Sequence, residues 1–463
     1  MRAILILALA VVAGCSARNR EPILPGTRLD VNAPIEDIAP SGDAAPSGGQ
    51  AGEAAAADPA RGLPAQDVPS GVAPVPVSIP APTANADWTH RGGSVTHRVA
   101  NAALGAQPQR IWSAGIGRGE TRRNRISSDP VVAQGRVFTL DADARVTAVG
   151  TNGAVLWSTD LTPPSDREGD ASGGGLAAAE GRVFATTGFG EIVALDAASG
   201  SVAWRQRLDA AVGGAPLVWN GTVYVAARDG SGWAVRAGDG KVLWRTAGAP
   251  GGAGIMGVSA PAVSENRVVF PFSSGQLVSS DAATGATVWQ GFVAGKRLGR
   301  AVASVADLTG DPVIADNIIY AGSSAGRLAA FDDRTGAPLW EARDGPLGPV
   351  AIAGEAIWLV SDENQLVRLD RATGRTVWRV DLPFFTKDKI RRRRDIFVHF
   401  GPVLAGGRLW TASTDGYLRA FDPESGAVAY ATPIPGGGAA SSPVVAGGTL
   451  YVVSRNGQLH AFR

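Results

Sequence analysis

A recurring segment constrains the fold of this chain more than any other feature, and its clearest copy is GRLAAFDDRTGAPLW at residues 326–340. Each copy has a short apolar run, an Asp or a substitute, a turn that ends at Gly, and a second run that ends on an aromatic residue. Asp, Ser and Thr side chains bond the backbone of a turn, and Gly adopts the left-handed conformation that reverses the chain. The segment therefore predicts a β-hairpin. Further copies stand at residues 145–157, 191–204, 233–244, 276–289, 365–378 and 417–430.

A second hairpin is predicted upstream of each copy, because a Pro-Val-like pair, a turn and another β-branched or aromatic run precede it. Examples are DPVVAQGRVFTL at residues 129–140 and SPVVAGGTLYVV at residues 442–453. Two hairpins in each repeat make a four-stranded antiparallel meander. The closing aromatic residues recur about every 40 to 50 residues, which is the period of propeller blades. They are Trp157, Trp204, Trp244, Trp289, Trp340, Trp378 and Tyr430.

Seven complete pairs of hairpins end at these aromatic residues, and an eighth begins at Ser442. Its third strand is predicted at residues 458–462, where the sequence ends, and residues 108–112 (PQRIW) are the candidate for its fourth strand. A ring closed by this N-terminal strand leaves no exposed sheet edge. We therefore predict an all-β fold over residues 87–463, an eight-bladed β-propeller of four-stranded antiparallel blades, with a seven-bladed ring as the alternative.

The first residues predict a targeting segment. Arg2 precedes an apolar run at residues 3–12 that is too short to span a bilayer. The run leads into VAGC at residues 12–15, which resembles the bacterial lipobox, where cleavage leaves an acylated Cys as the first residue. We therefore predict a lipoprotein signal peptide at residues 1–14 and lipidation of Cys15, with an ordinary secretory signal as the alternative. The Ser that follows Cys15 implies the periplasmic face of the outer membrane.

Residues 15–86 are predicted to be a disordered, lipid-anchored tether rich in Pro, Ala and Gly. Residues 16–86 contain no Trp, Tyr or Phe, so they cannot bury enough apolar surface to offset their conformational entropy. A flexible coil of this length reaches roughly 50 Å, which is enough to hold a folded domain off a membrane surface. Cys15 is the only cysteine of the chain, so no intrachain disulfide forms.

The hairpin with its closing Trp resembles the tryptophan-docking repeat of the quinoprotein (PQQ-like) propellers. Together with the lipobox and the tether, the repeats resemble the BamB family, lipoproteins of the outer-membrane β-barrel assembly (BAM) complex. Residues 255–261 (IMGVSAP) and 307–313 (DLTGDPV) match the family's segments that enter the fourth and fifth blades. The resemblance implies a non-catalytic scaffold without a cofactor. Its implied partners are the POTRA domains of BamA, other BAM components and unfolded outer-membrane protein clients.

Long connections between blades are the places where function is expected. Four connections are long, and each of them follows a closing Trp strand. All four are therefore predicted to emerge on the same face of the ring. The resemblance assigns the BamA contact to the two that flank the fourth blade. The four connections are residues 158–175, 245–259, 290–311 and 379–400.

Only some of the family's contact residues have a residue of the same type at the matching position of this chain. The family's Leu-x-Leu-Arg falls on residues 253–256, where only the second apolar position is kept and the Arg is absent. The family's Asp-x-Asp falls on residues 307–309, where only the first carboxylate is kept. The implied BamA-binding residues are Ala253, Ile255, Met256 and Asp307.

The connection at residues 379–400 carries a basic run. Lys387 and Lys389 precede four consecutive arginines, and an aromatic pair, Phe384 and Phe385, lies just upstream. One interpretation is solvated loop charge. The other is an anionic contact, either a lipid head group or an acidic patch on a partner. The arginines are Arg391, Arg392, Arg393 and Arg394.

Two other function classes fit a propeller. A PQQ-dependent dehydrogenase needs a metal held by a carboxylate cluster, yet the propeller region has no Cys and its four His do not have metal-ligand spacing. Repeated aspartates occupy the same turn position in each hairpin, so turn stabilisation explains them and we predict no enzyme. A glycan-binding propeller is the third class, but four Trp outside the closing positions fall in strand-like runs and not in loops. A formal net charge of +1 gives no attraction to nucleic acid.

Overall fold

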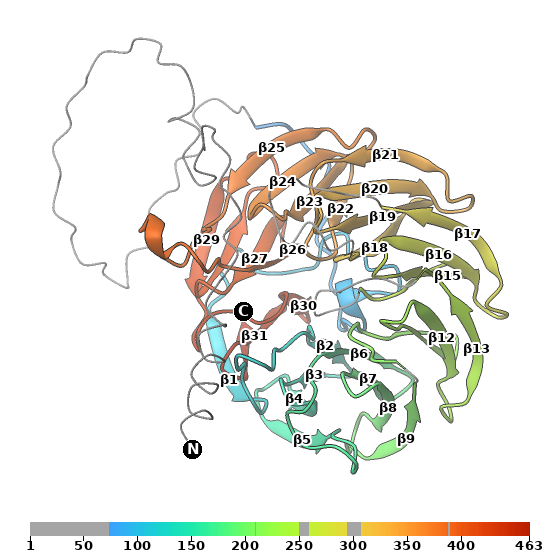
Figure 1. The fold of residues 1–463 in the computed structure, drawn as a ribbon. Coiled ribbons are helices and arrows are strands. Elements are labelled where there is room, and N and C mark those ends of the chain that lie inside the picture. Colours follow the sequence, from blue (N-terminus) through green and yellow to red (C-terminus); the bar gives the residue numbers. More distant parts are fainter. Residues whose placement is uncertain (1–73, 209, 250–258, 294–306, 388) are drawn as a thin grey trace, which may run out of the picture. The chain divides into compact units, whose positions relative to one another are not determined.

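The computed structural model of the chain describes residues 74–208, 210–249, 259–293, 307–387 and 389–463. The strands in these residues make eight four-stranded antiparallel sheets, which stand around a common centre as the blades of a propeller (Figure 1). Within each sheet the strands follow chain order from the centre outward, except that β1 completes the last sheet. The predicted eight-bladed β-propeller is confirmed, and the seven-bladed alternative is wrong.

The strand bounds follow the predicted repeats. Blade one consists of β2 (Val131–Ala133), β3 (Arg136–Leu140), β4 (Arg145–Gly150) and β5 (Val155–Asp160), and blade two of β6 (Gly174–Ala179), β7 (Arg182–Thr187), β8 (Glu191–Asp196) and β9 (Val202–Arg207). Blade three consists of β10 (Leu217–Trp219), β11 (Thr222–Ala226), β12 (Ser231–Arg236) and β13 (Val242–Ala247), and blade four of β14 (Ala262–Ser264), β15 (Arg267–Pro271), β16 (Gln276–Asp281) and β17 (Thr287–Phe292). Blade five consists of β18 (Gly310–Ala315), β19 (Ile318–Ser323), β20 (Arg327–Asp332) and β21 (Pro338–Ala342), and blade six of β22 (Ala351–Ala353), β23 (Ala356–Val360), β24 (Gln365–Asp370) and β25 (Thr376–Asp381). Blade seven consists of β26 (His399–Ala405), β27 (Arg408–Ser413), β28 (Tyr417–Phe421) and β29 (Val428–Pro433), and blade eight of β30 (Val444–Ala446), β31 (Thr449–Ser454), β32 (Gln458–Phe462) and β1 (Arg110–Gly115).

Blade eight closes the ring. β1 pairs antiparallel with β32, and Ser113 lies opposite His460. The Ser113 hydroxyl is 2.7 Å from Nδ1 of His460, which is fully buried. The Trp112 indole also donates to the carbonyl oxygen of Thr151 in blade one, at 3.0 Å. The N-terminal strand predicted at residues 108–112 therefore completes blade eight and docks it on blade one.

The repeated hairpin explains how neighbouring blades pack. The Asp370 carboxylate accepts hydrogen bonds from the backbone N–H and the hydroxyl of Thr373, at 2.9 and 2.6 Å. Gly374 has a φ of +69°, and a Cβ there would lie 2.4 Å from the Trp340 ring of the preceding blade. The Trp340 indole donates to the carbonyl oxygen of Arg371. Turn aspartates at the equivalent positions accept the same pair of bonds from Ser or Thr, so their predicted role in turn stabilisation is confirmed; they are Asp196, Asp281, Asp332 and Asp422.

Residues 83–102, which we call the plug, lie at the middle of the ring, where the blue segment of Figure 1 runs. The plug contains the 3₁₀ turn η3 (Arg91–Gly93) and hydrogen-bonds to the first strand of seven blades, or to the turn after it, within the described residues. The contacts join Trp88 to Val132, Thr89 to Ala178, His90 to Val218, Val95 to Val263, Thr96 to Ile314, Ala102 to Leu404 and Asn85 to Gly447.

The plug meets each first strand close to the turn that leads into the second strand. It therefore closes the ring on the face that carries these turns, which we call the plug face. Antiparallel strands alternate in direction, so the turns between third and fourth strands lie on the plug face as well. The connections between blades lie on the opposite face, which we call the connection face.

The residues just before the plug also contact the propeller, although they were expected to belong to the tether. The backbone N–H of Val75 donates to the carbonyl oxygen of Glu424 at 3.3 Å, and that of Ser78 donates to the Glu355 carboxylate at 3.1 Å. Arg368 donates to the carbonyl oxygen of Pro76 at 3.0 Å. Contacts with the propeller thus begin before the boundary expected between residues 86 and 87.

The predicted signal peptide, Cys15 and the first part of the predicted tether lie outside the described residues. In the part of the chain that is described, no helix is both long enough and apolar enough to cross a membrane.

Candidate functional site

The connection face around blade four is the site that the sequence predicts. The connections that enter and leave this blade are partly described, and their bases are joined. The Ser259 hydroxyl donates to the carbonyl oxygen of Leu308, and the Ala260 N–H donates to Oδ1 of Asp311 at 2.6 Å. The two connections are therefore spatial neighbours where they enter blades four and five.

The same bases are attached to the plug. Nε of Arg91 lies 2.8 Å from Oδ2 of Asp311 and 3.9 Å from Oδ2 of Asp129. The Asp311 side chain is fully buried, and 17% of the Arg91 side chain is exposed. Burial by itself would lower the pKa of Arg91, but the two carboxylates raise it above its usual value. Arg91 is therefore a cation that fixes the entry to blade five against the centre of the ring.

The predicted BamA-binding residues have different outcomes. Ala253, Ile255 and Met256 lie outside the described residues, so the structure does not place them. Asp307 is described and is only 1% exposed. Its carboxylate is therefore buried at the base of the connection, and its assignment as a BamA-binding residue stays a prediction.

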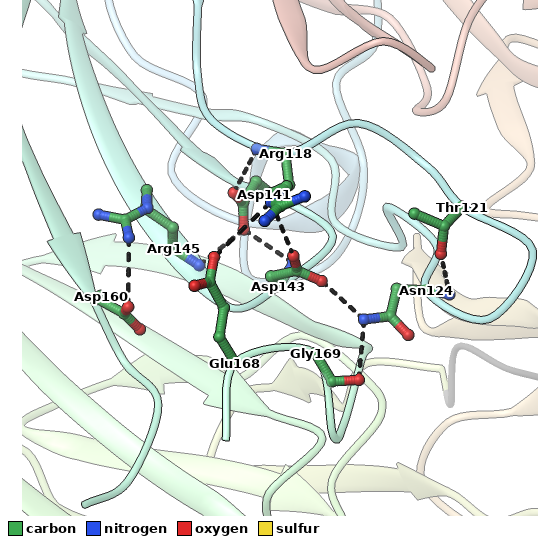
Figure 2. Close-up of polar contacts among 9 residues, drawn as sticks. All are labelled: Arg118, Thr121, Asn124, Asp141, Asp143, Arg145, Asp160, Glu168 and Gly169. Carbon is green, nitrogen blue, oxygen red and sulfur yellow. Dashed lines mark hydrogen bonds and ion pairs between the residues drawn. The ribbon is translucent and has the colours of Figure 1, made fainter. Parts of the chain in front are cut away.

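A further connection on this face, residues 116–130 between β1 and β2, was missed by the sequence reasoning. Figure 2 shows how it is held: Oδ2 of Asp141 accepts the N–H of Arg118 at 2.7 Å. Oδ1 of Asp141 accepts the N–H groups of Asp143 and Arg145 at 2.9 and 2.8 Å. Burial raises the pKa of Asp141 above its usual value. These three N–H bonds favour the charged form and offset part of that rise.

Asn124 joins this connection to the one between blades one and two (Figure 2). Its side-chain amide donates to Oδ1 of Asp143 at 2.7 Å and to the carbonyl oxygen of Gly169 at 3.1 Å. Nε of Arg118 lies 3.5 Å from Asp143 and 3.8 Å from Glu168. The network borders a hollow of about 390 Å³ on the same face, lined by Arg123, Asn124, Asp170, Arg228 and neighbouring small residues.

This connection was missed because the sequence reasoning counted connections from Trp157 onward. The preceding closing residue, Trp112, was treated only as the end of the N-terminal strand. The run GRGETRRNR at residues 117–125 is the signal that was available.

The basic connection between β25 and β26 is displayed at the surface. Residues 382–398, which we call the basic finger, include the 3₁₀ turn η5 (Ile390–Arg392). All four predicted arginines, Arg391, Arg392, Arg393 and Arg394, are exposed. The Arg393 guanidinium lies 5.0 Å from the centre of the Phe385 ring.

The residues that the structure describes do not fit the metal site of a quinoprotein dehydrogenase. The described residues contain no group of three or more His, Cys, Asp or Glu that could hold a metal ion. The four histidines are buried and bond to backbone or hydroxyl groups; they are His90, His97, His399 and His460. Burial lowers the pKa of His90 and of His460 to about 4, so both side chains are neutral at neutral pH.

Comparison with known proteins identifies one family in sequence. A family profile described as "Outer membrane protein assembly factor BamB" matches residues 142–380 and 387–463. A protein of that name from Yersinia pestis is 26% identical over 325 residues, which cover 69% of this chain and 79% of that protein. A protein of the same name from Alkalilimnicola ehrlichii is 32% identical over 174 residues, which cover 37% of this chain and 42% of that protein.

Solved structures show that the fold is shared more widely. The crystal structure of BamB from Moraxella catarrhalis has a TM-score of 0.63 at 19% identity and covers 77% of this chain and 99% of that one. A europium-containing methanol dehydrogenase has a TM-score of 0.62 at 14% identity and covers 79% of this chain and 89% of that one. An assembly factor and an enzyme are thus almost equally similar in fold, so the fold alone does not separate the two functions.

Proposed function

Because this chain belongs to the family of the outer membrane protein assembly factor BamB, we propose that it is a non-catalytic scaffold of outer-membrane protein assembly. The observation that carries the proposal is the family profile, which matches residues 142–380 and 387–463 and so spans the strands from β4 to β32. The structural likeness to dehydrogenases is of the same size as the likeness to BamB, so it is the sequence that favours the assembly role.

Two features of the molecule support a non-catalytic role. The described histidines and carboxylates do not gather into a metal site. The plug also occupies the centre of the ring, where Arg91 is already paired with Asp311 and Asp129. A small molecule bound at the centre of the ring would have to displace the ion pairs of Arg91 with Asp311 and Asp129.

The proposed partner is BamA, through its POTRA domains, together with other components of the BAM complex. The proposed docking surface is the connection face around blade four. Its support is the joined base at Ser259, Ala260 and Asp311, because a loop that rises from a rigid base loses less entropy on binding. Ala253, Ile255 and Met256 belong to the connection that ends at this base.

The proposed location is the periplasmic face of the outer membrane, with a lipid anchor at Cys15. Its support is the lipobox at residues 12–15 and the aromatic-free segment that follows it. Contacts with the propeller begin at Val75, so we propose that the tether ends near residue 74 and not at residue 86.

A pull-down from solubilised outer membrane with the tagged full-length chain tests this function. We expect recovery of BamA and its companions. Recovery of cell-wall glycan without any BAM component would contradict the proposal, as would quinone-dependent alcohol oxidation by the purified chain.

A further inference from the structure

The basic finger is built as a short hairpin that holds its tip away from the blades. Phe385 and Ile396 form an antiparallel bridge. The N–H of Thr386 donates to the carbonyl oxygen of Asp395 at 3.0 Å, and the N–H of Phe397 donates to that of Phe384 at 2.8 Å. The stem is further packed by the Phe384 and Phe385 rings, whose centres are 4.7 Å apart. Residues 387 and 389–394 therefore form a presented tip.

The tip has an unusual density of positive charge. Six of its seven described residues are Lys or Arg. Lys387, Lys389 and three arginines (Arg391, Arg392 and Arg394) are exposed and make no ion pair with a carboxylate of the described residues. Elsewhere on the propeller, arginines commonly lie within ion-pair distance of Asp or Glu, as Arg205 does with Glu191 at 2.9 Å. The charge of the tip is therefore available to an external anion.

The basic finger also carries exposed apolar side chains close to its cations. Ile390 is 76% exposed, and Ile396 and Val398 behind it are 48% and 39% exposed. A membrane surface accepts both kinds of group, because phosphates bind the cations while an apolar side chain enters the head-group layer. An acidic protein patch would pair the cations but would offer nothing to Ile390. The combination favours a lipid surface over an acidic protein.

We propose that the basic finger binds the surface of a membrane that contains anionic phospholipid. The contact would fix the orientation of the propeller relative to a membrane, which a flexible tether alone does not do. This inference goes beyond the scaffold role and does not depend on the partner protein. It follows from the charge, the exposed apolar tip and the hairpin stem of the finger.

Co-sedimentation with vesicles tests the proposal. The Cys15→Ala substitution in the full-length chain removes the acylation site, so any vesicle binding by this variant comes from protein contacts. We expect this chain to bind vesicles of phosphatidylethanolamine with phosphatidylglycerol and to bind vesicles of phosphatidylcholine much more weakly. Each exposed cation contributes about fivefold to such binding. Arg391→Gln, Arg392→Gln and Arg394→Gln together should therefore weaken binding by about a hundredfold, and Ile390→Ser alone should weaken it less.

A matched control removes the same charge on the plug face. Lys241→Gln, Arg334→Gln and Arg375→Gln change three exposed cations in turns between third and fourth strands. This control should bind the anionic vesicles as the parent chain does, and both triple variants should keep the parent melting temperature. Equal loss in the two triple variants would show non-specific charge attraction and overturn the proposal. Absence of vesicle binding by the parent chain would overturn it as well, even where an acidic protein or peptide still bound the finger.

Discussion

The two faces of the ring differ in how the chain uses them. On the plug face, one segment of the chain bonds to the first strands of seven blades within the described residues and buries Trp88 and Ala102. On the connection face, loops of unequal length rise from short, regular strands and carry the charged groups of Figure 2 and of the basic finger. The contrast indicates that the plug stabilises the ring, and it agrees with the proposal that partners dock on the connection face. Changes in the plug itself should therefore cost stability, and changes in the exposed loops of the connection face should cost binding.

Removal of residues 88–116 should have the largest effect, because it deletes most of the plug and all of β1. Blade eight would lose its outer strand, and the exposed edge of β32 would invite aggregation. We expect little folded protein by circular dichroism and size-exclusion chromatography. A matched deletion of residues 16–73 should leave the melting temperature nearly unchanged. Equal losses from both deletions would remove the distinction between tether and ring.

Arg91→Ala should have the next largest effect, since it leaves the buried Asp311 carboxylate without its cation. The expected loss in the free energy of unfolding is about 3 kcal/mol. Arg98→Ala in the same segment is the control, because the Arg98–Asp316 pair is 3.7 Å apart and its Asp side chain is 62% exposed. Its expected cost is within about 1 kcal/mol. Denaturant unfolding would measure both, and equal costs would mean that Arg91 does not anchor the plug.

Acid should weaken the ring through two histidines, His90 in the plug and His460 in β32. Burial lowers the pKa of each from 6.5 to about 4. The unfolded chain therefore binds protons that the folded chain does not, and stability is full above pH 6.5 and falls as the pH drops toward 4. Between about pH 7 and about pH 5 each histidine should cost about 2 kcal/mol.

Melting curves at the two pH values would measure this loss. The pair His90→Gln and His460→Gln should flatten the pH dependence, although it lowers stability at neutral pH. If the variant and the parent chain lost the same stability on acidification, the loss would have to come from other groups, such as the buried His97 and His399, whose pKa burial also lowers.

Arg118→Ala on the connection face should have the smallest effect on stability. Its side chain is 66% exposed, and its ion pairs with Asp143 and Glu168 are long, at 3.5 and 3.8 Å. Its backbone N–H, which bonds to Asp141, is unaffected by the change. We expect a change within about 0.5 kcal/mol by denaturant unfolding. A cost as large as that of Arg91→Ala would contradict the division of roles between the two faces.

The regular part of the fold was predictable because each blade repeats the same physical solution. A closing Trp needs a Gly in the next turn, as Trp340 and Gly374 show, and that pairing recurs in sequence. The plug was not predictable, because most of its contacts with the first strands are made by backbone groups, and its residues belong to no repeat. The burial of Asp307 was also hidden, since sequence similarity identified its position and not its surroundings.

The binding of purified POTRA fragments to two variants tests the central claim most directly. Ile255→Asp with Met256→Asp changes the proposed docking connection, and Lys241→Asp with Arg334→Asp changes the plug face. We predict that the first pair weakens binding by a few kcal/mol, as loss of apolar hot spots does, with an unchanged melting temperature. The second pair should bind as the parent chain does. Unchanged affinity in the Ile255 and Met256 variant, or a loss confined to the plug-face variant, would contradict docking through the connection face.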